Sequence, residues 1–177
     1  VEVSERLNEK GEVVTELNEE EVRNSLIKAK SDGINSVAIA FMHSYINPDH
    51  ENKIEQIAKE ENFNQISVSH KVSPLIKLVG RGDTTVVDAY LSPILRRYVN
   101  QVSDELQDTK STQLMFMQSN GGLTDANLFQ GKDALLSGPA GGVVSMTQTG
   151  KQAGFNKLIG FDMGGTSTDV CHFAGEF

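Results

Sequence analysis

The stretch FDMGGTSTD, at residues 161–169, combines residue types that suit phosphate binding. Its adjacent glycines carry no side chains, so successive backbone N–H groups can converge on phosphate oxygens. Its hydroxyl side chains can add donors, and an aspartate near each end can hold hydrated Mg²⁺, which takes only one or two carboxylates in proteins. The stretch therefore predicts a Mg²⁺ and polyphosphate site with the ligands Asp162, Gly164, Gly165, Thr166, Thr168 and Asp169.

The same stretch has a simpler interpretation, a plain β-hairpin with a glycine turn and polar surface side chains. The apolar run on each side and the aspartate at each end of the turn favour the phosphate site. The stretch is not a Walker A loop, because no Gly-Lys-Ser/Thr follows it, and it lacks the GxGxxG pattern of dinucleotide-binding turns. It predicts a strand, a phosphate-binding turn and an antiparallel return strand over 158–173.

A second glycine-rich stretch, Asn120-Gly121-Gly122, follows an apolar strand pattern at 114–119. Open α/β folds place ligands at the ends of strands, so these residues are candidates for a substrate or nucleotide contact. A tight turn that needs a positive φ explains them equally well. Both interpretations stay open.

Small residues also occur inside a helix predicted over 137–154, at Gly138, Gly141 and Gly142. Without side chains they let the helix approach another backbone closely. Close helix packing alone explains these glycines, and a contact with a ligand explains them equally well.

Other reactive side chains give no defensible catalytic arrangement, and the catalytic residue stays unidentified. The histidines share no metal-ligand spacing, and they are His43, His50, His70 and His172. His43 is expected to be a satisfied core or edge histidine. Arg81 and Asp83 could form an interlobe or subunit contact, but a structural salt bridge is the expected role. Cys171 is expected to be a small buried side chain on the same side of its strand as Asp169. Because it is the single cysteine, no disulfide can form within the chain, which favours a reducing, cytoplasmic setting.

The order of the predicted elements indicates an α/β fold with mixed, largely parallel sheets and flanking helices. Apolar periodicity and turn residues predict a hairpin over 3–17, helices over 18–33 and 47–63, strands over 34–44 and 65–73, a helical region over 84–110 with Pro93 inside it, and a short helix from Thr124 or Asp125. The run at 34–44 is apolar without alternation, which is typical of a strand buried on both faces.

Composition excludes some partners. The 177 residues carry 16 basic and 24 acidic side chains, a net charge of −8, and basic residues do not cluster, so nucleic acid is not expected to bind. No run approaches the roughly 20 apolar residues that span a bilayer, so no membrane partner is expected.

Several ordered strings resemble the hydantoinase A / 5-oxoprolinase family, closest to its 5-oxoprolinase and N-methylhydantoinase branch. They are FMHSYINPDHE (41–51), SPLIKLVGRGDTTVVDAYLSPILRRYV (73–99), FMQSNGGL (116–123), LLSGPAGGVV (135–144) and FDMGGTSTDV (161–170). The last is similar to the DxGGTxTD phosphate loop of the superfamily that contains actin, sugar kinases and heat-shock chaperones. The resemblance implies an actin-like or sugar-kinase-like ATPase fold with ribonuclease H-like lobes.

The resemblance also implies a function. Members of the family use ATP and Mg²⁺ to phosphorylate the carbonyl oxygen of a cyclic amide, which allows ring opening. Two alternatives stay open: a non-hydrolytic actin-like nucleotide-binding module, and the activating subunit of an ATP-dependent ketone carboxylase. The helix with Gly138, Gly141 and Gly142 would be the hinge between lobes, and a hydantoinase B-type subunit or domain would be a partner.

The resemblance divides the chain at residue 72, into the end of an N-terminal domain (1–72) and the start of the ATPase-like domain (73–177). Family members carry an earlier DxGGTxTD loop that this chain lacks, so an internal fragment of a larger subunit is expected. Such a fragment would be inactive alone, and its exposed apolar surface would favour homo-oligomers.

Overall fold

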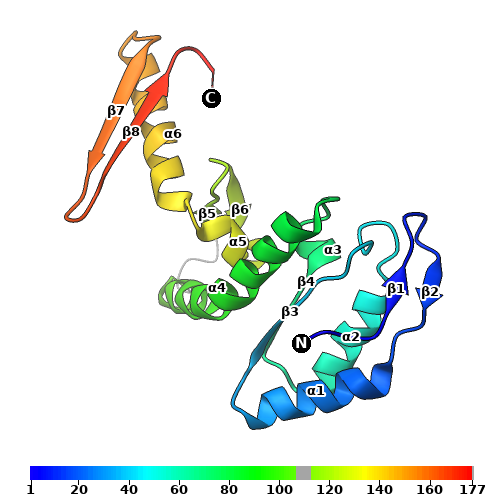
Figure 1. The fold of residues 1–177 in the computed structure, drawn as a ribbon. Coiled ribbons are helices and arrows are strands. Elements are labelled where there is room, and N and C mark those ends of the chain that lie inside the picture. Colours follow the sequence, from blue (N-terminus) through cyan, green and yellow to red (C-terminus); the bar gives the residue numbers. More distant parts are fainter. Residues whose placement is uncertain (107–112, 177) are drawn as a thin grey trace. The chain divides into compact units, whose positions relative to one another are not determined.

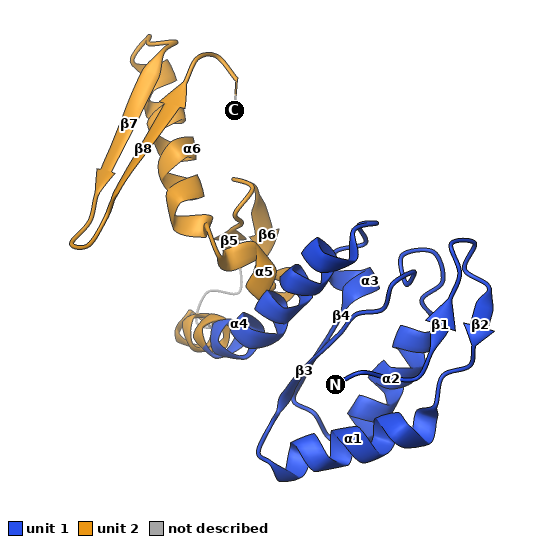
Figure 2. Ribbon diagram, in the orientation of Figure 1, with its two compact units in different colours: residues 1–97 blue, residues 98–177 orange. Residues whose placement is uncertain are grey.

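The computed structural model describes residues 1–106 and 113–176, so the part of the predicted helical region at 107–110 lies outside it. The chain forms two compact units, Val1–Arg97 and Tyr98–Phe177 (Figure 2). The elements of each unit are labelled in Figure 1. The predicted division at residue 72 stays a prediction.

The first unit opens with the predicted hairpin, in which β1 (Arg6–Leu7) pairs antiparallel with β2 (Val13–Thr15). Gly11 lies in its turn with a φ of 81°, a conformation that favours glycine. A Cβ at Gly11 would lie 2.9 Å from Cγ2 of Ile46. Both the turn and the close approach therefore require the glycine.

Two helices and two parallel strands form the core of this unit. They are α1 (Glu19–Ser31), β3 (Ser36–Ile39), α2 (Asp49–Glu60) and β4 (Gln65–Val68). Asn18 begins α1 as predicted, because its side chain accepts a hydrogen bond from the backbone N–H of Glu21 at 3.1 Å. Apolar side chains from all four elements are buried together: Leu17, Val22, Leu26, Ile39, Ile54, Ile57, Ala58, Phe63 and Val68.

The opposite face of the two strands meets α4 (Leu78–Glu105). Ser67 points away from the core because side chains alternate along a strand, and its hydroxyl donates to Asp88 at 2.6 Å. A Cβ at Gly82 would touch the Cβ of Ala40 at 4.0 Å. The strand predicted over 34–44 is shorter than expected: β3 spans only Ser36–Ile39, its first three residues are half-buried, and residues 42–46 form turns. Pro93 lies inside α4.

The strand predicted over 65–73 is wrong in its second half, where residues Ser69–Val72 form the short helix α3. The cause is a tertiary contact. The carboxylate of Glu51 accepts hydrogen bonds from the backbone N–H of His70 at 3.0 Å and from the hydroxyl of Ser69 at 2.6 Å. These bonds satisfy hydrogen-bond donors in the first turn of a helix. No local sequence pattern predicts them.

The second unit contains two antiparallel pairs and a long helix. Its elements are β5 (Met115–Met117), β6 (Leu123–Asp125), the 3₁₀ helix η1 (Ala126–Leu128), α5 (Gly131–Ala134), α6 (Ser137–Gln152), β7 (Leu158–Met163) and β8 (Thr168–Phe173). The helix expected from Thr124 or Asp125 is wrong at its start, because both residues pair with β5. Asp125 instead caps η1, and its pKa is lowered because its carboxylate accepts the backbone N–H of Asn127.

The mixed α/β class is confirmed. The expected predominance of parallel pairing is wrong for the described residues, in which β3 and β4 pair in parallel and the other sheets are antiparallel. Over residues 1–106 and 113–176, no helix is both long enough and apolar enough to cross a membrane.

An ion pair between α2 and α3 gives a pH-dependent contribution to stability. Burial alone would raise the pKa of Glu55, but hydrogen bonds from Lys71 and Lys59 outweigh it and hold the pKa below its ordinary value. A lowered pKa stabilises the fold above the unfolded-state pKa, and this contribution is lost as the pH falls. We expect Glu55→Gln to lower the free energy of unfolding by up to about 1 kcal/mol near neutral pH. Urea denaturation at about pH 7 and about pH 3 checks this: an equal loss at both pH values would contradict it.

Candidate functional site

The predicted phosphate hairpin is formed by β7 and β8. Its register places Asp162 directly opposite Asp169, and Met163 opposite Thr168. The backbone N–H of Gly164 donates to the carbonyl of Ser167 at 2.9 Å, which closes the turn. The two carboxylates therefore lie side by side at the end of the strands, and the glycines and hydroxyls form the exposed tip beyond them.

The glycines of the tip are not required by the turn itself. Neither Gly164 nor Gly165 has a positive φ. A Cβ at Gly165 would meet nothing within 4 Å, and one at Gly164 would make an ordinary 3.6 Å contact with the carbonyl oxygen of Ser167. Side chains there would instead cover the backbone that phosphate oxygens must reach. The loop therefore fits the polyphosphate role that its sequence predicts.

The inner face of the hairpin packs on α6, tightly at one end. A Cβ at Gly150 would lie 2.4 Å from Cδ1 of Leu158, and one at Gly160 would lie 2.5 Å from Sγ of Cys171 and 2.6 Å from Sδ of Met146. Towards the tip the packing is looser, and a Cβ at Gly142 would make only an ordinary contact, at 3.9 Å, with Oδ2 of Asp162.

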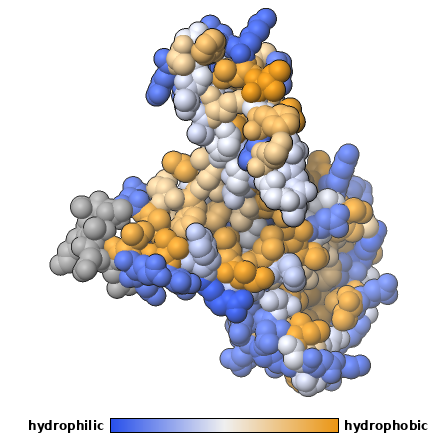
Figure 3. Space-filling model, turned by 90° about the vertical axis from the view of Figure 1, so that its left-hand side faces the viewer, coloured by the Kyte–Doolittle hydropathy of each residue, from blue (hydrophilic) through white to orange (hydrophobic). Residues whose placement is uncertain are grey.

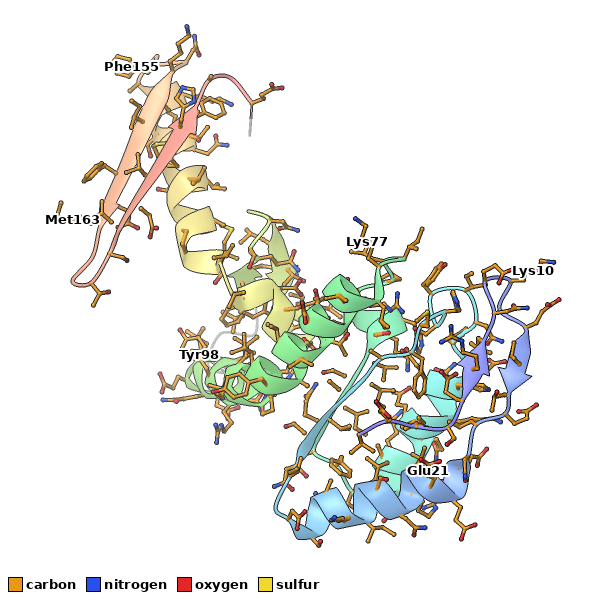
Figure 4. The ribbon with its side chains drawn as sticks, viewed as in Figure 1. Lys10, Glu21, Lys77, Tyr98, Phe155 and Met163 are labelled. Carbon is orange, nitrogen blue, oxygen red and sulfur yellow. The ribbon has the colours of Figure 1, made fainter. Side chains whose placement is uncertain are left out.

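An open pocket of about 530 Å³ lies between the helix and the hairpin. Its lining comes from α6 (Pro139, Gly142, Val143, Met146), β7 (Ile159, Gly160, Phe161, Asp162) and β8 (Asp169, Val170, Cys171). In Figure 4, Phe155 and Met163 mark the two ends of the stretch that contains β7. Cys171 lines the pocket with Asp169, on the same side of β8 as predicted, and is half-buried with its Sγ 3.9 Å from Sδ of Met146.

The Asn120-Gly121-Gly122 turn lies against α6 at a different pocket. Gly121 has a φ of 82°, and a Cβ there would be 3.2 Å from Cγ2 of Val144. This second pocket, of about 320 Å³, is lined by Ser119, Asn120, Gly121, Ala140, Val143 and Val144. Val143 borders both pockets.

The structure thus brings together only some of the predicted site residues. Gly142, Asp162 and Asp169 line the first pocket, and Asn120 and Gly121 line the second. The remaining candidates line neither pocket: Gly122, Gly138, Gly141, Gly164, Gly165, Thr166 and Thr168. Among them, a Cβ at Gly141 would contact Cγ of Met117 at 3.7 Å, and one at Gly138 would meet nothing within 4 Å.

The tight end of the packing gives a stability prediction. Gly160→Ala would force a methyl group against Cys171 and Met146, and we expect a loss of about 1–3 kcal/mol in unfolding free energy. Because Cys171 is the single cysteine, its rate of reaction with a thiol reagent should rise as the hairpin separates from the helix. Gly138→Ala, where a Cβ meets nothing, is the matched control. Unchanged stability and thiol reactivity in Gly160→Ala would contradict this packing.

Sequence reasoning missed a buried polar network in the first unit. The expected salt bridge between Arg81 and Asp83 is wrong: Arg81 is fully buried, whereas Asp83 is exposed. Residues two apart on a helix do not face each other, so the pair cannot meet. The Arg81 guanidinium donates instead to backbone carbonyls and one hydroxyl, on Phe41, Met42, Ser69, Leu75 and Ile76.

Glu51 is the acidic centre of the same network and is also fully buried. One carboxylate oxygen accepts the backbone N–H of Phe41 at 2.9 Å and the hydroxyl of Ser69 at 2.6 Å. The other accepts the backbone N–H of His70 at 3.0 Å and its Nδ1 at 2.7 Å. The sequence contained one signal that could have pointed to this network: residues 41–51 and 73–99 both belong to the strings that carry the family resemblance.

The expectation that the ring of His43 has its hydrogen-bond partners is wrong for one nitrogen. Its Nδ1 is buried without a partner among the described residues. His50 is similar: its Nδ1 lies 2.7 Å from a carboxylate oxygen of Glu5, and its buried Nε2 has no partner there. In the described parts of the chain, no three acidic, histidine or cysteine side chains gather as a metal site.

Two solved structures share this fold. The nucleotide-free structure of acetone carboxylase superimposes with a TM-score of 0.89 at 26% identity, covering 98% of this chain and 26% of that one. The ATP-dependent caprolactamase of Pseudomonas jessenii superimposes with a TM-score of 0.83 at 29% identity, covering 96% of this chain and 25% of that one. These likenesses place the chain in the actin-like ATPase class of mixed α/β folds.

Comparison of the sequence with protein families identifies its family. The hydantoinase/oxoprolinase pattern matches residues 81–177, and the pattern of the N-terminal region of that family matches residues 1–62. The chain belongs to the hydantoinase/oxoprolinase family. A 5-oxoprolinase of Saccharomyces cerevisiae is 46% identical over 162 residues, which are 91% of this chain and 13% of the yeast protein. The chain thus spans a small part of the relatives that it matches.

Proposed function

We propose that the full-length protein opens a cyclic amide at the expense of ATP, by phosphorylating the amide carbonyl oxygen. The observation that carries the proposal is the pairing of Asp162 with Asp169 below a glycine tip, whose glycines are not required by any close contact with the described residues. Relatives named for 5-oxoproline and caprolactam support a cyclic amide as the substrate.

In this proposal the hairpin tip binds the phosphates. Gly164 leaves the backbone of the tip uncovered, and the backbone N–H of Gly165 and the hydroxyls of Thr166 and Thr168 donate to phosphate oxygens. Asp162 and Asp169 hold Mg²⁺ through water, and bound Mg²⁺ supplies the positive charge that offsets the phosphates.

Phosphorylation would overcome the low reactivity of an amide towards water. An amide is stabilised by resonance, and its nitrogen is a poor leaving group. Once the carbonyl oxygen carries a phosphoryl group, the carbon is a stronger electrophile for water. The protein's task is then to position the reactants and neutralise charge.

The other predicted site residues keep supporting roles in the proposal. Gly138, Gly141 and Gly142 are assigned to a hinge helix that moves as nucleotide binds. Asn120, Gly121 and Gly122 are assigned to contacts with substrate. The pocket at the second group is separate from the one at Asp162, which fits a division between substrate and nucleotide.

The proposal extends to partners and setting. A hydantoinase B-type subunit or domain would complete the enzyme, which would work in the cytoplasm. Homo-oligomers are expected because the hairpin exposes Ile159, Phe161, Met163 and Val170. Figure 3 shows apolar residues, in orange, exposed on one face of the molecule.

A second candidate is the activating subunit of an ATP-dependent ketone carboxylase. The superposition on acetone carboxylase, with a TM-score of 0.89, is the observation that favours it. A non-hydrolytic nucleotide module of the actin type is the remaining alternative.

ATP hydrolysis by the full-length protein separates these candidates. We expect 5-oxoproline, caprolactam or a hydantoin to stimulate release of ADP and phosphate in step with a ring-opened product detected by mass spectrometry. Stimulation only by a ketone with bicarbonate would favour the carboxylase. Binding of Mg-ATP without turnover in either assay would favour the nucleotide module.

A further inference from the structure

We propose that Val143 is a specificity-determining residue that contacts both the nucleotide and the cyclic amide. The inference rests on the proposed function, in which the first pocket, at Asp162, takes the nucleotide and the second pocket, at Asn120, takes the substrate. It goes further by assigning one side chain of α6 to the boundary between the two ligands.

Helical geometry explains why one residue can line two pockets. Each residue of an α-helix is rotated by roughly 100° from the residue before it. Pro139, Val143 and Met146 of α6 therefore lie along one stripe, which faces the first pocket. Ala140 and Val144 lie on the adjacent stripe, which faces the second pocket. Val143 lies where the two stripes meet, and it is the one described residue that lines both pockets.

Close contacts on both sides of α6 fix the position of Val143. On the side of the first pocket, a Cβ at Gly150 would lie 2.4 Å from Cδ1 of Leu158 in β7. On the side of the second pocket, a Cβ at Gly121 would lie 3.2 Å from Cγ2 of Val144. All of these residues belong to the second unit, so the geometry of both pockets is set within that unit.

The side chain of Val143 is suited to act as a fixed wall. It is half-buried, so part of its surface is open to a ligand. Valine is branched at Cβ and keeps one strongly preferred rotamer in a helix. A rigid apolar wall of this kind discriminates between ligands by their size.

The second pocket has the chemical character that a small cyclic amide needs. Its volume is about 320 Å³, and Ala140, Val143 and Val144 give it an apolar wall that suits ring methylenes. Asn120 adds a polar group: its Oδ1 accepts the backbone N–H of Gly122 at 2.8 Å, and its NH₂ group can donate to a carbonyl oxygen. Cyclic amides of different ring size differ in their number of methylenes, so the apolar wall is where ring size is sensed.

Three alanine variants of the full-length protein test the assignment. Two quantities are measured on each: the KM for 5-oxoproline, caprolactam or hydantoin, whichever supports turnover, and the calorimetric Kd of a non-hydrolysable Mg-ATP analogue. Val143→Ala should raise both by about 10-fold, because it removes two methyl groups from both pockets. Val144→Ala, in the second pocket alone, should raise only the KM, and Pro139→Ala, in the first pocket alone, should raise only the Kd.

Ring size gives an independent test of the same wall. Val143→Ala opens the wall, so the ratio of kcat/KM for caprolactam to that for 5-oxoproline should rise by about 10-fold. Val143→Ile extends the side chain and should lower this ratio. Val14→Ala, the same change at an exposed position of β2, is the matched control and should leave the ratio, the KM and the Kd unchanged.

Urea denaturation shows whether each variant folds, and Val143→Ile decides the test if Val143→Ala does not. A folded Val143→Ala that weakens only one of the two ligands, or neither, would overturn the assignment alone. So would a ring-size ratio that moves in the same direction in Val143→Ala and Val143→Ile. A wild-type protein without turnover that depends on a cyclic amide would overturn the proposed function and this assignment with it.

Discussion

Asp162→Asn in the full-length protein is expected to lower ATP turnover by at least about 100-fold, with little change in folding. Asparagine has nearly the same size as aspartate but lacks the negative charge that holds hydrated Mg²⁺. The side chain is at the exposed end of the hairpin, so the fold should tolerate the change. Steady-state release of phosphate, measured over a range of Mg²⁺ concentrations, checks the prediction.

The control for this variant is Asp32→Asn, which removes an exposed carboxylate after α1 and should leave turnover unchanged. Raised Mg²⁺ should restore part of the activity of Asp162→Asn, because Asp169 remains opposite it. Wild-type turnover in a folded Asp162→Asn would show that the hairpin is a plain turn, the simpler interpretation of its sequence.

Glu51→Ala is expected to cost about 3–5 kcal/mol of unfolding free energy. The change leaves Arg81 as a buried charge without its anion and removes the acceptor of four donors. The free energy of unfolding of an ordinary domain is only about 5–15 kcal/mol, so this loss would be a large part of it. Urea denaturation followed by circular dichroism measures the loss.

Glu60→Ala, on the same helix, is the matched control. Glu60 is exposed, and its contact with Arg23 is a surface ion pair, which contributes little to stability. Replacing Glu51 and Arg81 together by leucine and methionine should cost less than the sum of the single changes, because the charges then disappear together. Additive costs would show that Ser69 does not couple the two residues.

Much of the fold could be predicted because its signals are local. The cap at Asn18, the turn at Gly11 and the hairpin over 158–173 each depend on residues close together in the chain. The pairing of Asp162 with Asp169 follows from the length of the turn between them. The register of such a hairpin is therefore readable from sequence.

The features that escaped prediction depend on residues far apart. Ser69 begins a helix instead of extending a strand because Glu51, from another helix, accepts its hydroxyl. Arg81 is buried because carbonyls from distant loops surround it. Propensity favours neither outcome, since burial of a charged side chain is decided only when the whole unit packs.

The hydroxyl of Ser69 has a consequence for how the first unit is made. Glu51 is synthesised before its partners Ser69, His70 and Arg81. Until Arg81 has left the ribosome, the carboxylate cannot be buried with its countercharge. We therefore expect the apolar contacts of α2 with α1 and β3 to be able to form during synthesis before the buried polar network does.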